Sequence, residues 1–234
     1  LMNKLADKYL REGMVPTKAC QGCAIGAIEM WLLQAIDELG LKKEDVIFGA
    51  GIGCVGRMTF ATWGGDNFGA THGRAMAVAT GLKLAQQDKK ILLVVGDGDA
   101  ASIGTSHLIH AARRNIGMTV ICEDNMGYQS TGGQFSPTTP NDYVTNSSPY
   151  GMVEQSFDPC DVVIAAGATF VAETTSVQWR QTVKIVKKAM QNDGFSFVHI
   201  RFPCIENFGA QALGSRDPLV GMDWIYDHTK GKTK

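Results

Sequence analysis

Apolar positions along the chain form two alternating patterns. Short and nearly continuous apolar runs are typical of strands buried on both faces of a sheet; they predict strands at residues 46–49, 90–96, 118–122, 162–165 and 195–200. Longer segments carry apolar residues at helical spacing; they predict helices at residues 22–39, 73–87, 104–114 and 175–192. Gly40 follows the first of these helices as a C-terminal cap.

This alternation predicts the α/β class: a doubly wound, mostly parallel sheet with helices on both faces. We expect a single domain over residues 1–234, with a short C-terminal tail after about residue 205. A polar stretch over residues 124–148 is rich in Gly, Pro, Thr and Asn. Long irregular segments inside compact domains are usually functional, so we expect this stretch to serve a site.

Composition narrows the possible classes of protein. Apolar residues make up 44% of the 234 residues and charged residues 19%, which excludes intrinsic disorder. A net charge of -1 argues against a nucleic-acid partner. No apolar run is long enough to span a bilayer, and the charged, amphipathic first residues are unlike a secretory signal. We therefore expect a soluble, cytoplasmic protein that does not bind a membrane.

The segment after the second predicted strand has the features of a phosphate and metal site. It reads Gly96-Asp97-Gly98-Asp99, and ligands of such sheets bind beyond the carboxyl ends of the strands. Glycines let the backbone approach a phosphate, the following helix directs amide groups at it, and Asp97 offers a hard oxygen to Mg²⁺. Asn125 follows the next strand and should emerge at the same edge of the sheet.

The spacing of these residues makes the signal more specific. Twenty-six residues separate Gly98 from Asn125, which resembles the signature of thiamine diphosphate-binding proteins. The carbonyl of Gly127 is the expected backbone ligand of the metal. A tight turn with solvated acids is the alternative interpretation of the glycine-rich segment alone.

Six cysteines form a second constellation. Disulfides are the less favoured use in a chain expected to be cytoplasmic, so a metal or cluster is the better hypothesis. Cys20, Cys23, Cys54 and Cys204 lie at the ends of predicted elements and suit a four-thiolate site for zinc or a [4Fe–4S] cluster. A neighbouring thiamine site favours the cluster, because oxidative carbanion chemistry needs an electron acceptor. Cys122 and Cys160 are interpreted as structural.

These motifs together resemble one family, the thiamine-binding β subunits of 2-oxoacid:ferredoxin oxidoreductases. The resemblance runs through nearly the whole chain, in the order CQGC, GIGCVGR, THGRAMAVATGLKLA, VVGDGDAASIGTSHLIHAARRNI, DNMGYQSTGGQFSPTTP and RFPC. Several motifs in a fixed order are more specific than any single one. GIGCVGR, THGR and SPTTP are most similar to the 2-oxoglutarate branch.

The resemblance implies a set of cofactors and ligands. It implies thiamine diphosphate, Mg²⁺ held by Asp97, Asn125 and the Gly127 carbonyl, and a [4Fe–4S] cluster. The cluster ligands would be the four cysteines of CQGC, GIGC and RFPC, namely Cys20, Cys23, Cys54 and Cys204. Gly96, Gly98 and Asp99 belong to the diphosphate site.

The same resemblance implies the reaction and its partners. A 2-oxoacid, preferably 2-oxoglutarate, would be oxidatively decarboxylated with coenzyme A to an acyl-CoA and CO₂, with electrons passed to ferredoxin. No glutamate has a recognisable context for activating the thiamine. In the family that glutamate comes from a partner α subunit, so this chain should be active only in a heteromer.

Three further residues are candidates for the site. His72 precedes a helix start and should contact the cofactor or a reacting oxygen. Arg57, three residues after Cys54, could pair with a substrate carboxylate. Thr131 could contact the diphosphate. Gln21 and Ile205 stand where many relatives have proline, and neither change removes a ligand.

Departures from the family pattern keep alternatives open. Many 2-oxoglutarate relatives differ over residues 128–134, a loop expected to face the substrate, so pyruvate or a branched or aromatic 2-oxoacid remains an alternative. A non-oxidative thiamine decarboxylase or synthase, with zinc on the cysteines, is another. A third is a non-catalytic iron–sulfur subunit in which the glycine-rich segment is only a turn.

Overall fold

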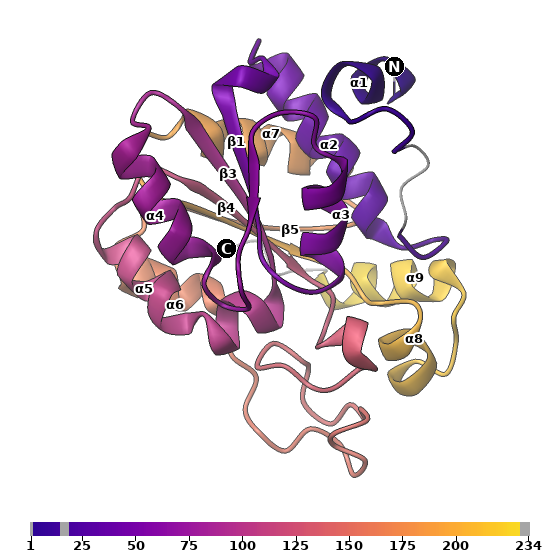
Figure 1. Cartoon of the computed structure of the whole chain (residues 1–234). Helices are drawn as coiled ribbons and strands as arrows, with labels where there is room; N and C mark the ends of the chain where they lie inside the picture. The colour runs from indigo at the N-terminus through magenta and orange to yellow at the C-terminus, as the bar shows by residue number, and fades with distance from the viewer. Residues whose placement is uncertain (1, 15–18, 230–234) are drawn as a thin grey trace.

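The backbone builds a six-stranded sheet in which all neighbouring strands are parallel (Figure 1). The computed structural model describes residues 2–14 and 19–229, without the side chains of residues 2, 3, 57–60 and 229. The strand order is β2-β1-β3-β4-β6-β5. The strands are β1 (Val46–Ala50), β2 (Asn67–Gly69), β3 (Lys90–Gly96), β4 (Thr119–Asp124), β5 (Phe170–Thr175) and β6 (Ser196–Arg201).

Helices cover both faces of this sheet (Figure 1). One core layer lies under α1 (Met2–Tyr9), α2 (Ala24–Glu38), α3 (Cys54–Thr62) and α7 (Trp179–Gln191). The other lies under α4 (Ala75–Ala85), α5 (Thr105–Arg113) and α6 (Pro159–Ala165). Alternate residues of β3 enter opposite layers: Leu92 belongs to the first and Leu93 to the second, and both are fully buried. The doubly wound α/β prediction is confirmed.

Parallel pairing of β3 with β4 brings the two predicted ligand segments together. Gly96 at the end of β3 is in register with Glu123 near the end of β4. Asp97 and Asn125 each follow directly, so both emerge at the carboxyl edge of adjacent strands. A π-helical turn (Asp99–Ile103) and α5 then continue from the glycine-rich segment.

One predicted strand was wrong. Residues 162–165 lie in α6, where Asp158 caps the helix through a hydrogen bond from the Cys160 amide and Pro159 takes the first turn. The strand in this region is β5, whose apolar character is interrupted by Glu173 and which lies at the edge of the sheet. The short β2 and the helix α3 within the glycine-rich turn were not predicted either.

The segment after residue 205 contains two helices, α8 (Asn207–Ala212) and α9 (Pro218–Thr229). Phe208 and Ile225 of these helices form a small apolar cluster with Met126, which follows β4. The tail thereby packs against the loop that carries Asn125 and Gly127. The division into one domain and a tail stays a prediction. Across the described residues, no helix combines the length and the apolar character that crossing a membrane would require.

Candidate cofactor site

A small acidic pocket of about 70 Å³ lies at the carboxyl ends of β3 and β4. It brings together all of the predicted diphosphate and magnesium residues and His72: Gly96, Asp97, Gly98, Asp99, Asn125, Gly127, Thr131 and His72. Among the described residues that line it there is no glutamate. Most of the polar side chains that line it carry oxygen atoms, among them Asp97, Asp99 and Asn125.

Three groups converge at the base of this pocket. The end of the Asn125 side chain lies 3.3 Å from Asp97 Oδ1 and 2.9 Å from the Gly127 carbonyl oxygen. In one orientation of the amide, its nitrogen donates to both oxygens. In the other, its oxygen joins them as a third oxygen ligand. A carboxylate, an amide oxygen and a backbone carbonyl are the donor set that suits Mg²⁺, so the residues fit this ion.

Asp97 is held in place from its other side. Ser136 donates to Asp97 Oδ2, and the Thr138 hydroxyl lies 3.1 Å from the same oxygen. Complete burial, followed by the nearby charge of Asp124, raises the pKa of Asp97 to about 7, although these two hydroxyls oppose the shift. A cation in the pocket would remove this penalty on the ionised form.

The chain after β4 is bent so that Asn125 and Gly127 face the same point. Asp124 Oδ1 accepts a hydrogen bond of 3.0 Å from the Met126 amide, which closes a local turn. Met126 has a φ of 69°, a left-handed conformation that is costly for a residue with a side chain. Gly127 has a φ of 148°, and a Cβ there would lie 2.5 Å from the Gln134 carbonyl oxygen. The backbone is therefore strained where it presents the Gly127 carbonyl.

His72 is tied to the acidic segment. Its Nδ1 lies 2.6 Å from Asp99 Oδ1, and the Gly73 amide donates to the same oxygen at 2.6 Å. Burial raises the pKa of Asp99, and the Gly73 amide and His72 oppose this shift. The pairing fixes the imidazole at the rim of the pocket, which leaves its second nitrogen for another contact.

Tyr128 also lines the pocket, although the sequence analysis did not predict it as a site residue. Its hydroxyl lies 3.3 Å from the Gly98 carbonyl oxygen, to which it donates. A Cβ on Gly98 would lie 2.4 Å from the Tyr128 ring, so glycine is required for this close packing. Thr131 is exposed and donates to Gln134 Oε1 at 2.7 Å.

The four predicted cluster ligands line a second cavity, of about 570 Å³. Cys20 and Cys23 lie at the entry to α2, Cys54 begins α3, and Cys204 follows β6. None of the six cysteines, all within the described ranges, forms a disulfide. Four cysteines from three segments that line one cavity fit a metal or cluster bound through sulfur.

The surroundings of Cys23 and Cys204 favour the protonated thiol over the ionised thiolate when no cation is bound. Burial, then the neighbouring Cys204, Cys20 and Glu123, raise the pKa of Cys23 to about 12, an effect that the Ile25 amide opposes. Burial also raises the pKa of Cys204, which amide groups at the start of α8 counteract. A cationic centre would stabilise the thiolates, and amide hydrogen bonds to sulfur are typical of iron–sulfur sites.

The two hollows adjoin each other. Cys54, Asn125, Gln129 and Ser130 line both of them. Arg57 lies in α3, but its side chain is outside the described part of the structure. Cys122 is fully buried in β4, and Cys160 is buried at the start of α6. The ligand roles assigned to the pocket and cavity residues stay predictions.

The comparisons with known proteins agree with this geometry. The family model for the C-terminal TPP-binding domain of thiamine pyrophosphate enzymes matches residues 51–200. Fold and pocket thus define a domain of the thiamine diphosphate-dependent enzymes.

Similar proteins show which family of thiamine diphosphate-dependent enzymes the chain belongs to. The chain is 44% identical over 224 residues to the 2-oxoglutarate synthase subunit KorB of Methanocaldococcus jannaschii. This match covers 96% of this chain and 82% of the relative. It is 43% identical to the KorB subunit of Archaeoglobus fulgidus, over 84% of this chain and 73% of that one. The chain belongs to this family of β subunits of 2-oxoacid:ferredoxin oxidoreductases, which confirms the predicted resemblance.

A solved structure supports the same assignment. It is the 2-oxoglutarate:ferredoxin oxidoreductase from Magnetococcus marinus, with 2-oxoglutarate, coenzyme A and succinyl-CoA bound. The match has a TM-score of 0.80 at 35% identity and covers 83% of this chain and 66% of that chain.

Proposed function

We propose that this chain is the thiamine diphosphate-binding β subunit of a 2-oxoglutarate:ferredoxin oxidoreductase. The reaction is the coenzyme A-dependent oxidative decarboxylation of 2-oxoglutarate to an acyl-CoA and CO₂, with electrons passed to ferredoxin. The observation that carries the proposal is the shared wall of the two hollows. Cys54 and Asn125 each line both the acidic pocket and the cysteine cavity, so a carbon centre and an electron acceptor would be neighbours.

The residues of the two hollows have distinct tasks in this proposal. When bound, thiamine diphosphate supplies carbanion stabilisation and a [4Fe–4S] cluster accepts electrons one at a time. Asp97, Asn125 and the Gly127 carbonyl hold Mg²⁺, while Gly96 and Gly98 let the backbone approach the diphosphate. The cluster ligands are Cys20, Cys23, Cys54 and Cys204.

Residues at the rim bind and orient the reactants. His72, fixed by Asp99, presents its second nitrogen to the cofactor or to a reacting oxygen. Arg57 pairs with a carboxylate of the substrate, and Thr131 contacts the diphosphate. The family resemblance supports a partner α subunit as the source of the activating glutamate, and none lines the acidic pocket among the described residues.

A binding and activity experiment on the complex purified with its partner subunit tests this function. Titration calorimetry with thiamine diphosphate and Mg²⁺ should show at least about 100-fold weaker binding for Asp97→Ala, because a charged metal ligand is lost. The exposed Asp7→Ala on α1 is the matched control and should bind normally. Unchanged binding by Asp97→Ala would contradict the assigned pocket.

The substrate is tested separately with a panel of 2-oxoacids, coenzyme A and a low-potential acceptor. We expect the highest kcat/KM for 2-oxoglutarate. A preference for pyruvate or a branched 2-oxoacid would refute the substrate. Decarboxylation without reduction of the acceptor would refute the oxidative reaction.

A further inference from the structure

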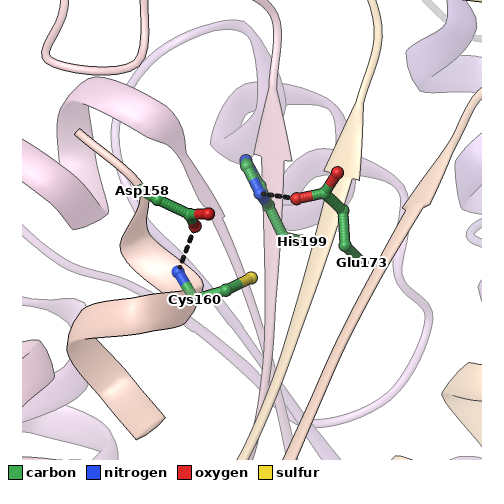
Figure 2. Close-up of side chains that lie close together, drawn as sticks. All are labelled: Asp158, Cys160, Glu173 and His199. Atoms are coloured by element: carbon green, nitrogen blue, oxygen red, sulfur yellow. Dashed lines mark hydrogen bonds and ion pairs between the residues drawn. The ribbon is translucent and has the colours of Figure 1, made fainter. Parts of the chain in front are cut away.

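A second group of metal-ligating side chains lies on the face of the sheet covered by α6, apart from the cofactor pockets. Asp158 and Cys160 stand at the start of α6, Glu173 on β5 and His199 on β6. One ligand atom from each residue lies within 4.8 Å of all the others. Figure 2 shows the Cys160 sulfur and the Glu173 carboxylate turned toward the imidazole of His199. None of these residues lines the acidic pocket or the cysteine cavity.

His199 is oriented as a metal ligand usually is. Its Nε2 lies 3.0 Å from Asp124 Oδ2, and Asp124 is itself held by the Met126 amide. Histidines that bind metals typically donate their other ring N–H to a carboxylate, which fixes the ring and its tautomer. The Asp124 contact leaves Nδ1 pointing into the cluster.

The Nδ1 atom of His199 has no hydrogen-bond partner within the described ranges, although the side chain is only 3% exposed. Glu173 Oε2 lies 3.5 Å away, a distance at which the two groups attract each other only if the imidazole is protonated. A buried nitrogen that lacks a hydrogen bond and faces a thiol and two carboxylates is suited to a cation.

We propose that Asp158, Cys160, Glu173 and His199 form a structural site for a divalent metal ion of the zinc class. Thiol and imidazole ligands favour zinc over Mg²⁺, and four protein ligands are typical of a structural rather than a catalytic site. Tetrahedral zinc with bonds of about 2.0–2.3 Å needs ligand atoms about 3.3–3.8 Å apart. The cluster reaches that spacing by small side-chain movements, for which the Glu173 side chain, 32% exposed, has room. The ion would fasten the start of α6 to β5 and β6.

Metal binding replaces protons at this site. Burial alone lowers the pKa of His199, but the hydrogen bond with Asp124 and the nearby Cys160 and Glu173 outweigh it and raise the pKa well above its ordinary value. Burial raises the pKa of the Cys160 thiol, which His199 opposes. One divalent ion would displace the protons of His199 Nδ1 and Cys160, so the net charge of the cluster would not change.

The test uses the purified complex that contains the full chain, equilibrated with Zn²⁺ after removal of loosely bound metal. We expect one additional zinc per chain, whose X-ray absorption spectrum shows one sulfur and three nitrogen or oxygen neighbours. Glu173→Gln and Cys160→Ser should each weaken zinc binding at least about tenfold, as lost ligands do. Glu154→Gln, on the exposed segment before α6, is the matched control and should bind like the unaltered chain.

Two outcomes would overturn the site. Zinc with four sulfur neighbours would place the ion on the cysteine cavity instead. Glu173→Gln is a conservative change of a partly exposed residue. If this variant bound zinc as tightly as the unaltered chain, the proposed set of four ligands would be wrong. Failure of the thiamine diphosphate binding test would leave this result untouched, because the two sites share no ligand.

Discussion

Two glutamates are buried close to the cysteine-lined cavity. Glu29 on α2 is 2% exposed; its Oε1 accepts from the Thr62 hydroxyl, while Oε2 has no hydrogen-bond partner in the described part of the chain. Both carboxylate oxygens of Glu123 on β4 also lack one there. Burial raises the pKa of Glu29 to about 7, and burial together with the charge of Glu29 raises that of Glu123 well above its ordinary value. Because burial disfavours the charged carboxylate, both glutamates are stabilised in their protonated form.

Glu29 should make the stability of the fold depend on pH. Its pKa is about 7 in the folded chain against 4.5 in the unfolded chain, so the unfolded state ionises first as the pH rises. The stability that Glu29 contributes is complete below pH 4.5 and is lost by about pH 7, a loss of up to about 3 kcal/mol. Glu29→Gln should remove this loss and gain stability over the unaltered chain between pH 5 and about 8.

Urea unfolding of the full chain at several pH values measures this difference. Glu12→Gln, at an exposed position between α1 and α2, is the control and should leave the pH dependence unchanged. If Glu29→Gln and the unaltered chain differ by the same free energy of unfolding at pH 5 and pH 8, Glu29 is not the group responsible.

Single residues of the pocket differ in how far the sequence predicts them. Asp97 and Asn125 stand out because each follows the end of a strand that contains an apolar run, and their spacing matches the thiamine diphosphate signature. Ser136 and Thr138 were missed, although both hydroxyls approach Asp97. Their contacts arise only when residues 128–139 fold back over the strand ends, and local periodicity does not encode that return. The hydroxyl-rich SPTTP segment was the one available signal.

At the scale of elements, burial on both faces decides which strands are predictable. β3 and β4 are central and almost entirely buried, and each contains a continuous apolar run, so both are predictable from the sequence. β5 is an edge strand with a partly exposed pattern, whereas the apolar run of α6 is short enough to suit a helix or a strand. The Asp-Pro pair at residues 158–159, a helix-start signal, resolves that ambiguity.

Glycine inside α4 offers a test of helix energetics. Gly81 is exposed, and a Cβ added there would meet no atom within 4 Å. Gly81→Ala should therefore raise the free energy of unfolding by about 0.5–1 kcal/mol, because alanine loses less backbone entropy in a helix. Chemical denaturation of the full chain measures the change.

The same substitution in α3 should have the opposite sign. A Cβ on Gly56 would lie 1.8 Å from the Gly51 carbonyl oxygen, so Gly56→Ala must displace backbone. We expect it to lower the free energy of unfolding by more than about 1 kcal/mol. Equal effects of the two substitutions would show that helix propensity, not space, governs both positions.

At the scale of the whole molecule, the cysteine cavity joins parts that are remote in sequence. Cys20 and Cys23 precede α2, Cys54 begins α3, and Cys204 lies between β6 and α8. Their spacing along the chain suggested a four-thiolate site but could not show that they meet, because this depends on how α2 and α3 pack on the sheet. The resemblance of ordered motifs supplied the grouping, and the fold brings the four residues to one cavity.

A cluster held by these segments should contribute to the stability of the entire fold. It would link the N-terminal region, α3 and the C-terminal helices, and binding to the folded state alone stabilises that state. Cys204→Ala should remove the visible absorption band that dithionite bleaches, lower the bound iron, and lower the Tm of the complex toward that of the iron-free unaltered complex.

Cys122→Ala separates loss of the cluster from loss of a buried thiol. Cys122 is fully buried in β4, so its truncation should cost about 1 kcal/mol while bound iron and the absorption band stay unchanged. If Cys204→Ala retained its iron, or if Cys122→Ala lost it, the four cysteines lining the cavity would not be the ligands. If Cys204→Ala lost iron without any fall in Tm, the cluster would be bound there but would not hold the segments together.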